Sequence, residues 1–156
     1  MKERWLEKGS SYNLIFDEAY ERFGVGGRKK TFFIEKSVEI FRNFKPDLKL
    51  SDRTTTILDD LKDKYRLFLV TDGNSMLQRQ KFVSLGLGKW FLKENCIFTG
   101  DYGKSNYKPS VKAMQQFFSK CSPSKCLFFG DRDVDREFAE FAGMNFVRMT
   151  NMMVVK

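Results

Sequence analysis

The fold is decided by one segment of the chain, Cys126-Leu127-Phe128-Phe129-Gly130-Asp131-Arg132-Asp133-Val134-Asp135. Its apolar first half is short and is closed by a glycine, a pattern typical of a buried strand in a parallel sheet. Its second half carries three acidic residues, which then lie at the edge of the sheet where α/β proteins bind ligands. Carboxylates this close in sequence repel each other unless a cation or a base lies among them. The segment therefore indicates a strand that leads into a site for an oxygen-ligated metal such as Mg²⁺.

Outward from this segment, the spacing of apolar residues predicts strands and helices in alternation. The predicted strands cover 65–71, 96–99, 126–129 and 145–149, and the predicted helices cover 54–63, 75–85, 109–121 and 134–142. Pro109 and Ser110 suit the start of the third of these helices. Short links between alternating elements favour a parallel sheet with helices on both faces. We therefore expect an α/β fold with a three-layer, Rossmann-like parallel sheet.

The N-terminal part of the chain has a different pattern, because its apolar residues recur at helical spacing only. One amphipathic helix is predicted over 12–23 and a second over 31–44. The first helix is predicted to begin at Ser10 or Ser11 and to end at Gly24, which opens a turn over 24–27. The second helix is predicted to end before Pro46. We expect two domains, a helical segment over 1–50 and an α/β core over 51–156.

The composition narrows the class of protein. The 156 residues are 42% hydrophobic and 31% charged, which suits one globular domain with a real core or a small domain with an appendage. No apolar run approaches the roughly 18 residues of a membrane span, and the N-terminus lacks the apolar core of a signal peptide. We therefore expect a cytoplasmic protein without membrane association. The absence of histidine excludes histidine general bases and histidine-ligated zinc.

The charges and the cysteines do not indicate a partner by themselves. The net charge is +8, and it fits nucleic acid or an anionic small substrate. The basic residues are scattered, with Arg28-Lys29-Lys30 as the longest block, so nucleic-acid binding is not expected. Cys96, Cys121 and Cys126 are an odd number without metal-binding spacing, and we interpret them as reduced thiols.

Three features lie at predicted strand ends or helix starts: Thr71, Lys108 and the acidic cluster at 131–135. Each has an ordinary structural explanation, since acids also favour the first turn of a helix and lysines are common on surfaces. Together they supply a hydroxyl, an ammonium group and metal-binding carboxylates. Phosphoryl transfer needs this combination, because it stabilises the charge that develops on phosphate oxygens.

The order of these pieces resembles the haloacid dehalogenase-like hydrolase superfamily, chiefly its phosphatase branch with a helical cap. The segment 69–74 looks like the second motif of that family, with the helix behind it. The segments 98–103 and 107–110 look like the loop that carries its third-motif lysine, and 128–131 with Asp135 looks like its fourth motif. The resemblance covers about 12–149 and implies that 1–50 is the remnant of a cap.

The resemblance implies a Mg²⁺-dependent phosphatase that acts on a phosphorylated small molecule, whose identity the sequence does not give. The implied roles are phosphate binding by Thr71, Asp72, Gly73 and Lys108, catalysis by Lys108, and Mg²⁺ binding by Asp131 and Asp135. Asp133 has no implied role and is interpreted as a neighbour of the cluster.

The family's first motif, an apolar strand that ends in Asp-x-Asp, is not found ahead of these segments. Asp17 follows apolar residues, but Ala19 stands where the second Asp belongs, and the segment keeps a helical period. Asp131 and Asp133 form an Asp-x-Asp, but the Thr71 and Lys108 segments then precede it. Because this motif supplies the nucleophile and the general acid/base, we expect the chain by itself to be impaired or inactive.

Three arrangements would compensate for the missing strand. It lies upstream of Met1, a partner chain or a homodimer supplies it, or the sheet is reorganised around its absence. The alternative function is a non-catalytic module that binds phosphate or metal, or serves in assembly, and derives from such a hydrolase.

Overall fold

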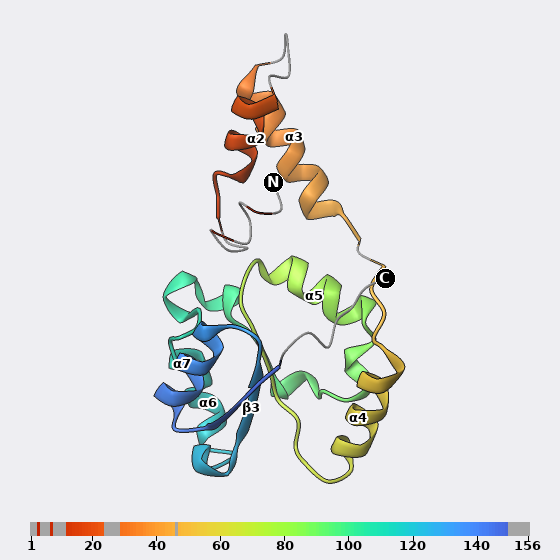
Figure 1. Cartoon of the computed structure of the whole chain (residues 1–156), viewed down its shortest axis with the longest axis vertical. Helices are drawn as coiled ribbons and strands as arrows, with labels where there is room; N and C mark the ends of the chain where they lie inside the picture. Colours follow the sequence, from red (N-terminus) through yellow and green to blue (C-terminus); the bar gives the residue numbers. More distant parts are fainter. Residues whose placement is uncertain (1–2, 4–6, 8–11, 24–28, 46, 150–156) are drawn as a thin grey trace. The chain divides into compact units, whose positions relative to one another are not determined.

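The computed structural model describes Glu3, Glu7 and the ranges 12–23, 29–45 and 47–149 (Figure 1). The chain divides into two compact units, Met1–Asp47 and Leu48–Lys156. Some predicted features lie outside the described residues: the boundaries at Ser10, Ser11 and Gly24, the turn over 24–27, and Pro46. In the ranges that the structure describes, no helix is long and apolar enough to cross a membrane.

The first unit contains the two predicted helices, α2 (Ile15–Phe23) and α3 (Lys30–Asn43). Ala19 is the buried residue of α2, and aromatic rings join the two helices. These ring contacts are Phe16 with Phe41 at 6.0 Å and Tyr20 with Phe33 at 5.5 Å between centroids. Asp17 lies within α2, so the helical interpretation of this segment is confirmed. The role of the unit as a cap stays a prediction.

The second unit alternates helices and strands as predicted. Its main elements are α4 (Asp52–Lys62), β1 (Leu69–Thr71), α5 (Ser75–Ser84), β2 (Cys96–Phe98), α6 (Gln115–Phe118), β3 (Leu127–Gly130), α7 (Asp133–Ala142) and β4 (Asn145–Arg148). Side chains cap the start of two helices. At α4 the Ser51 hydroxyl accepts a hydrogen bond from Thr54 N, and at α5 the Asn74 side chain accepts one from Leu77 N. Gly86 follows α5 at φ +62°, a conformation that glycine adopts without strain.

The strands are parallel, which confirms the predicted direction, but they form two sheets. In the first sheet β1 pairs with β2, with Leu69 opposite Cys96. In the second sheet β3 pairs with β4, with Leu127 opposite Asn145. No ladder of hydrogen bonds joins β1 to β3 within the described part of the chain. The predicted parallel sheet is thus present as two pairs of strands, as expected for a core that lacks one strand, and β1 is shorter than the predicted strand 65–71.

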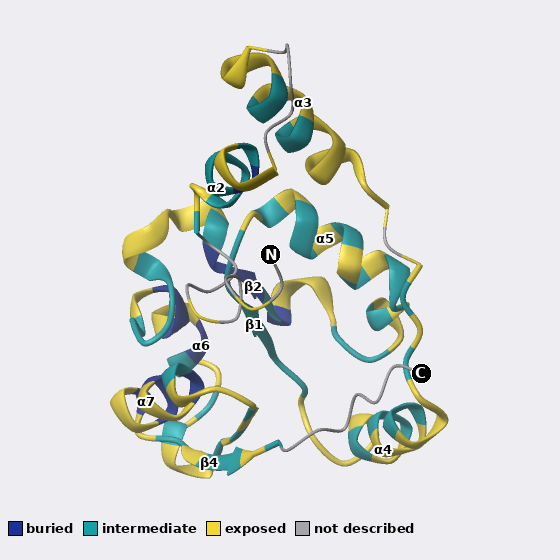
Figure 2. Ribbon diagram, turned by 45° about the horizontal axis from the view of Figure 1, so that its top comes forward, coloured by how far each residue is buried: buried dark blue, intermediate teal, exposed yellow. Residues whose placement is uncertain are grey.

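Both sheets pack against one hydrophobic core, and this shared core joins them into the second compact unit (Figure 2). The core consists of Ile97, Ala113, Met114, Phe117 and Phe138, all buried. Val70 of β1 and Phe128 of β3 both pack against this cluster. The two strands thus cover the same core although no backbone hydrogen bond connects them.

The predicted helix over 109–121 is wrong. The peptide bond between Lys108 and Pro109 is cis, and the next amide, Ser110 N, donates to Tyr107 O at 2.9 Å. The α-helical turn is confined to α6, after a 3₁₀ turn over Lys112–Met114. Lys108 N donates to the Asp72 carboxylate, so a long-range contact holds this backbone where the local sequence favours a helix start.

Candidate functional site

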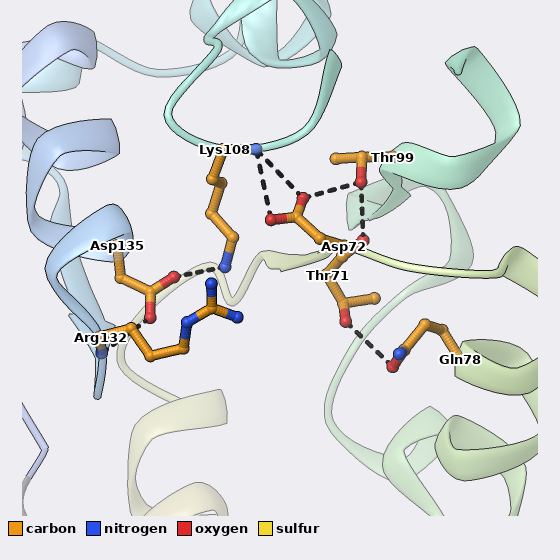
Figure 3. A network of polar contacts seen from close by, with 7 residues as sticks. All are labelled: Thr71, Asp72, Gln78, Thr99, Lys108, Arg132 and Asp135. Carbon is orange, nitrogen blue, oxygen red and sulfur yellow. Dashed lines mark hydrogen bonds and ion pairs between the residues drawn. The ribbon is translucent and has the colours of Figure 1, made fainter. Parts of the chain in front are cut away.

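The predicted site residues lie where β1 and β3 end, and the loop that carries Lys108 lies between them (Figure 3). Asp72 and Gly73 directly follow β1, and Asp131 directly follows β3. In Figure 3 the Lys108 side chain extends from beside Asp72 towards Asp135. Carboxyl ends of neighbouring parallel strands are the usual ligand-binding edge of α/β proteins.

Asp72 holds the backbone of the site together. Its carboxylate accepts from Lys108 N at 3.2 Å to each oxygen, and the Thr99 hydroxyl lies 2.8 Å from Oδ1. Thr99 is almost fully buried and also lies within 3.2 Å of the Thr71 carbonyl oxygen. The Asp72 carboxylate therefore fixes the position of the Lys108 loop. Direct phosphate binding by Asp72 stays a prediction. Thr99 lies in the segment 98–103 that resembles the third-motif loop, but no role was predicted for it.

Lys108 and Asp135 form a buried ion pair. The Lys108 Nζ to Asp135 Oδ1 distance is 2.5 Å, and the two side chains are only 13% and 6% exposed. The other carboxylate oxygen accepts from Arg132 N at 3.1 Å. Lys108 Nζ also lies 5.7 Å from the centre of the Phe128 ring, within cation–π range. The ammonium group is thus held from two sides and is largely shielded from water.

Gly130 permits this arrangement because it leaves room for Asp135. A Cβ atom on Gly130 would lie 2.4 Å from Asp135 Cβ and 2.8 Å from its Cγ. The glycine that closes the apolar run is therefore needed for the close approach of α7 to the end of β3. Gly130, at the predicted end of the strand, is therefore in close contact with Asp135, one of the predicted site residues.

The pKa of Asp135 is lowered, although its burial acts in the opposite direction. Burial is the largest influence and raises the pKa, but the hydrogen bond and the charge of Lys108 together with Arg132 N outweigh it. A lowered pKa in the folded state means that the ionised carboxylate stabilises the protein. That stabilisation is present above the ordinary aspartate pKa of about 4 and is lost as the pH falls through the lowered value.

Acidification should therefore destabilise the chain partly through Asp135. Between about pH 6 and about pH 3, we expect the free energy of unfolding to fall, because the unfolded state binds the Asp135 proton more readily. Urea unfolding across this range, compared with Asp135→Asn, measures the contribution. The variant should lose less stability over the acidic range than the natural chain, and equal losses in both proteins would contradict the assignment.

Thr71 ends β1 and Gly73 follows it, and the Gln78 side chain lies near both residues. The Thr71 hydroxyl donates to Gln78 Oε1 at 3.1 Å. Gly73 has φ +115°, which favours glycine, and a Cβ there would lie 3.1 Å from Gln78 Nε2. The hydroxyl is engaged by Gln78 of α5, so a ligand that uses Thr71 must compete with this hydrogen bond.

Arg132 is a second cation at the site, and sequence reasoning did not select it. Figure 3 shows its guanidinium group beside the Lys108 side chain. Its charge is among the influences that lower the pKa of Asp135. Lys108 and Arg132 thus place two cations close together beside the buried carboxylate of Asp135, and such donors suit an anionic ligand. The only signal in the sequence was its place directly after Asp131.

The acidic cluster fits a divalent cation only in part. Asp133 is ion-paired with Arg148 and Arg136, and both oxygens of Asp135 are engaged as described above. Asp131 is exposed, and no partner of its carboxylate occurs among the residues that the structure covers. These same residues contain no group of three or more His, Cys, Asp or Glu side chains that could hold a metal. Asp131 suits one position on Mg²⁺, which accepts one or two carboxylates beside water and phosphate, so the other ligands must come from elsewhere.

Comparisons with known proteins agree on one family. The family model of haloacid dehalogenase-like hydrolases matches residues 7–149. A glyceraldehyde 3-phosphate phosphatase of Methanothermobacter thermautotrophicus is 27% identical over 152 residues. This match covers 94% of the chain but only 65% of the relative, so the chain spans less than two thirds of that protein's length.

Solved structures show the same fold. A putative hydrolase of this superfamily from Bacillus subtilis, YfnB bound to magnesium, superposes with a TM-score of 0.69 at 21% identity. This match covers 96% of the chain and 67% of that protein. A superfamily hydrolase of subfamily IA from Geobacter sulfurreducens gives a TM-score of 0.62 at 24% identity, covering 93% of the chain and 66% of that protein. The predicted Rossmann-like α/β fold is thereby confirmed.

Proposed function

The chain belongs to the haloacid dehalogenase-like hydrolases, and on that premise we propose that Leu48–Lys156 supplies the phosphate-holding part of a phosphomonoester hydrolase site. A relative named as the phosphatase of a phosphate monoester supports this substrate class. The particular substrate is not specified by the site. The observation that carries the proposal is the fixed, shielded ammonium group of Lys108 between the ends of β1 and β3.

Each site residue has a role in the proposal. The Lys108 ammonium holds phosphate oxygens and offsets the charge of nearby carboxylates, and a group fixed in advance does so without reorganisation. The Thr71 hydroxyl and the backbone at Gly73 offer donors to the phosphoryl group, and Asp72 positions Lys108 through its backbone amide. Asp135 holds the ammonium group in place from the other side.

We also propose that Asp131 contributes one oxygen ligand to Mg²⁺. Asp131 is exposed directly after β3, and a structural neighbour from Bacillus subtilis is described as bound to magnesium. When bound, the ion would neutralise charge on the phosphoryl oxygens. Asp135 remains the partner of Lys108 in this proposal and acts on the metal site indirectly.

The nucleophile and the general acid/base are proposed to come from a strand outside the motifs found in residues 1–156. That strand would lie between β1 and β3 and end in Asp-x-Asp, in a preceding segment of the same polypeptide or in a second chain. Without it, the site binds and polarises a phosphate but has no group to attack phosphorus.

Three observations support a strand between β1 and β3. Each of these strands has a hydrogen-bonded neighbour on one edge only within the described ranges. Lys108 binds Asp72 at the end of β1 through its backbone amide and Asp135, which lies beside Gly130 at the end of β3, through its ammonium group, so a whole lysine side chain lies between the two strand ends. Leu127 and Phe129 of β3 are 53% and 51% exposed, so one face of this strand lacks the cover that parallel strands usually have, and the segment connected to an inserted strand would cover it.

The test is hydrolysis of an aryl phosphate by the pure chain in the presence of Mg²⁺. By itself the chain should give no more product than the blank. Adding a synthetic peptide with an apolar strand that ends in Asp-x-Asp should produce turnover. A matched peptide that ends in Asn-x-Asn should not, because it pairs with the same strand edges but offers no nucleophile.

Two outcomes would overturn the proposal. Turnover by the chain without peptide, lost in Asp131→Ala, would show that a nucleophile lies within residues 1–156. Binding of inorganic phosphate with no turnover under either peptide would favour the alternative, a non-catalytic phosphate-binding or assembly module.

A further inference from the structure

A pair of thiols lies at the amino end of β3, apart from the site described above. Cys126 directly precedes β3, and Cys121 follows α6. Their sulfur atoms are 3.5 Å apart, and both side chains are half-buried. We propose that Cys121 and Cys126 are a redox modification site that forms an intramolecular disulfide under mild oxidation. This inference is independent of the proposed hydrolase function.

The backbone on both sides of the pair is fixed, so the two sulfur atoms stay close. Cys121 N donates to Phe117 O at 3.1 Å, and Phe117 is 1% exposed in the hydrophobic core. Cys126 N donates to Pro123 O at 2.8 Å, and Cys126 O accepts from Asn145 N of β4 at 3.1 Å. A disulfide therefore needs only a small movement of the two side chains rather than a rearrangement of the chain.

The third cysteine lacks these features and serves as an internal control. The Cys96 thiol donates to Leu92 O at 3.3 Å. No cysteine partner lies beside it in the part of the chain that the structure describes. Oxidation of Cys96 can therefore lead only to adducts or to links between two chains.

The chemistry balances with a peroxide as oxidant. Hydrogen peroxide converts the Cys121 thiol to a sulfenic acid and releases one water. The Cys126 sulfur then attacks the Cys121 sulfur, the S–O bond breaks, and a second water leaves with the Cys126 proton. In sum, two thiols lose two electrons and two protons, and the peroxide is reduced to two waters.

The second step depends on the thiolate of Cys126. Burial, followed by its contact with Cys121, raises the pKa of Cys126 to about 11. At neutral pH little of it is thiolate, and the thiolate is the attacking species. The second step should therefore accelerate about tenfold per pH unit as the pH rises towards this value.

The bond would tie the end of α6 to the start of β3. Phe117 of α6 anchors the core, and Cys126 leads into the ladder between β3 and β4. The Lys108–Asp135 pair lies at the opposite, carboxyl end of β3. Oxidation should accordingly raise the resistance of the second unit to unfolding and leave phosphate binding at that end unchanged.

The experiment treats the full chain with a small excess of hydrogen peroxide and maps its peptides by mass spectrometry without reduction. We expect a crosslink between the peptides of Cys121 and Cys126, loss of two hydrogen masses from the intact chain, and a higher urea midpoint that a reductant reverses. The variant Cys96→Ser should behave in the same way. Cys121→Ser and Cys126→Ser should each abolish the crosslink and the shift in midpoint.

Two results would overturn the inference. One is a disulfide through Cys96 between two chains as the main product of the natural chain. The other is the absence of an intramolecular crosslink in Cys96→Ser while peroxide is consumed and both remaining thiols still react with a thiol reagent.

Discussion

Replacing Lys108 with methionine is expected to lower the free energy of unfolding by about 3–5 kcal/mol, the usual effect of removing one partner from a buried ion pair. The Asp135 side chain is 6% exposed, and its carboxylate would keep only the Arg132 amide of the two groups that now bind it. Methionine preserves the length of the apolar part of the side chain, so lost packing contributes little. Urea unfolding at neutral pH measures the change.

The matched control is the double variant Lys108→Met with Asp135→Asn. The asparagine side-chain oxygen can still accept the hydrogen bond from Arg132 N, and asparagine carries no charge. The double variant should therefore regain most of the stability that Lys108→Met loses. A double variant that is as unstable as Lys108→Met would show that Lys108 acts through its packing and not through the charge.

The pH dependence gives an independent check with opposite signs. In the natural chain the pKa of Asp135 is lowered, so stability falls as the pH drops through that value. In Lys108→Met burial should raise this pKa above its ordinary value, so protonation on acidification should restore stability. A stability that falls in parallel in both proteins between about pH 6 and about pH 4 would contradict the ion-pair explanation.

Replacing Gly100 with alanine is expected to cost about 3 kcal/mol of stability, at the upper end of the usual range for overpacking. A Cβ at this position would lie 2.2 Å from Gly73 O, 2.7 Å from Ser75 Oγ and 3.1 Å from Ser75 N. A backbone oxygen cannot move aside as the end of a flexible side chain can. The clash therefore separates the segment after β2 from the segment after β1, where the site residues lie.

Gly88→Ala is the matched control, because the nearest atom to its Cβ among the described residues would be Phe82 Cε1 at 3.8 Å, an ordinary contact. Its stability should stay within about 1 kcal/mol of the natural chain, since alanine also restricts the unfolded state. Gly100→Ala should in addition weaken the binding of inorganic phosphate, because Asp72, Gly73 and Lys108 are displaced together. Equal free energies of unfolding for the two alanine variants would contradict this prediction, because they would show that the Gly73 backbone moves away from the added Cβ at little cost.

Local patterns predicted the fold well where they were reinforced by packing. The apolar run before Gly130 and the helical period after Asp133 gave β3 and α7 nearly residue by residue. The helix predicted from Pro109 failed because the Lys108 amide is bound by Asp72, a partner far away in the sequence. Propensity is a weak prior wherever such a contact competes with it.

The site was predictable as a set of residues but not as a set of contacts. Lys108 and Asp135 were both selected from the sequence, but the ion pair between them was not predicted, and the metal-binding role assigned to Asp135 stays a prediction. No site role was predicted for Thr99, Gln78 or Arg132, because their contacts with Asp72, Thr71 and Asp135 depend on the three-dimensional arrangement. The cytoplasmic location and the cap role of the first unit stay predictions.

The division of the strands into two ladders has a consequence for how the second unit opens. Backbone hydrogen bonds make a continuous sheet cooperative, but none connects β1 to β3 across the described ranges. The two halves are joined instead by their shared apolar core and by Lys108, whose amide binds one half and whose ammonium binds the other. Each ladder can therefore fluctuate as a sub-global unit, and amide hydrogen exchange would distinguish two protection classes where a continuous sheet has one.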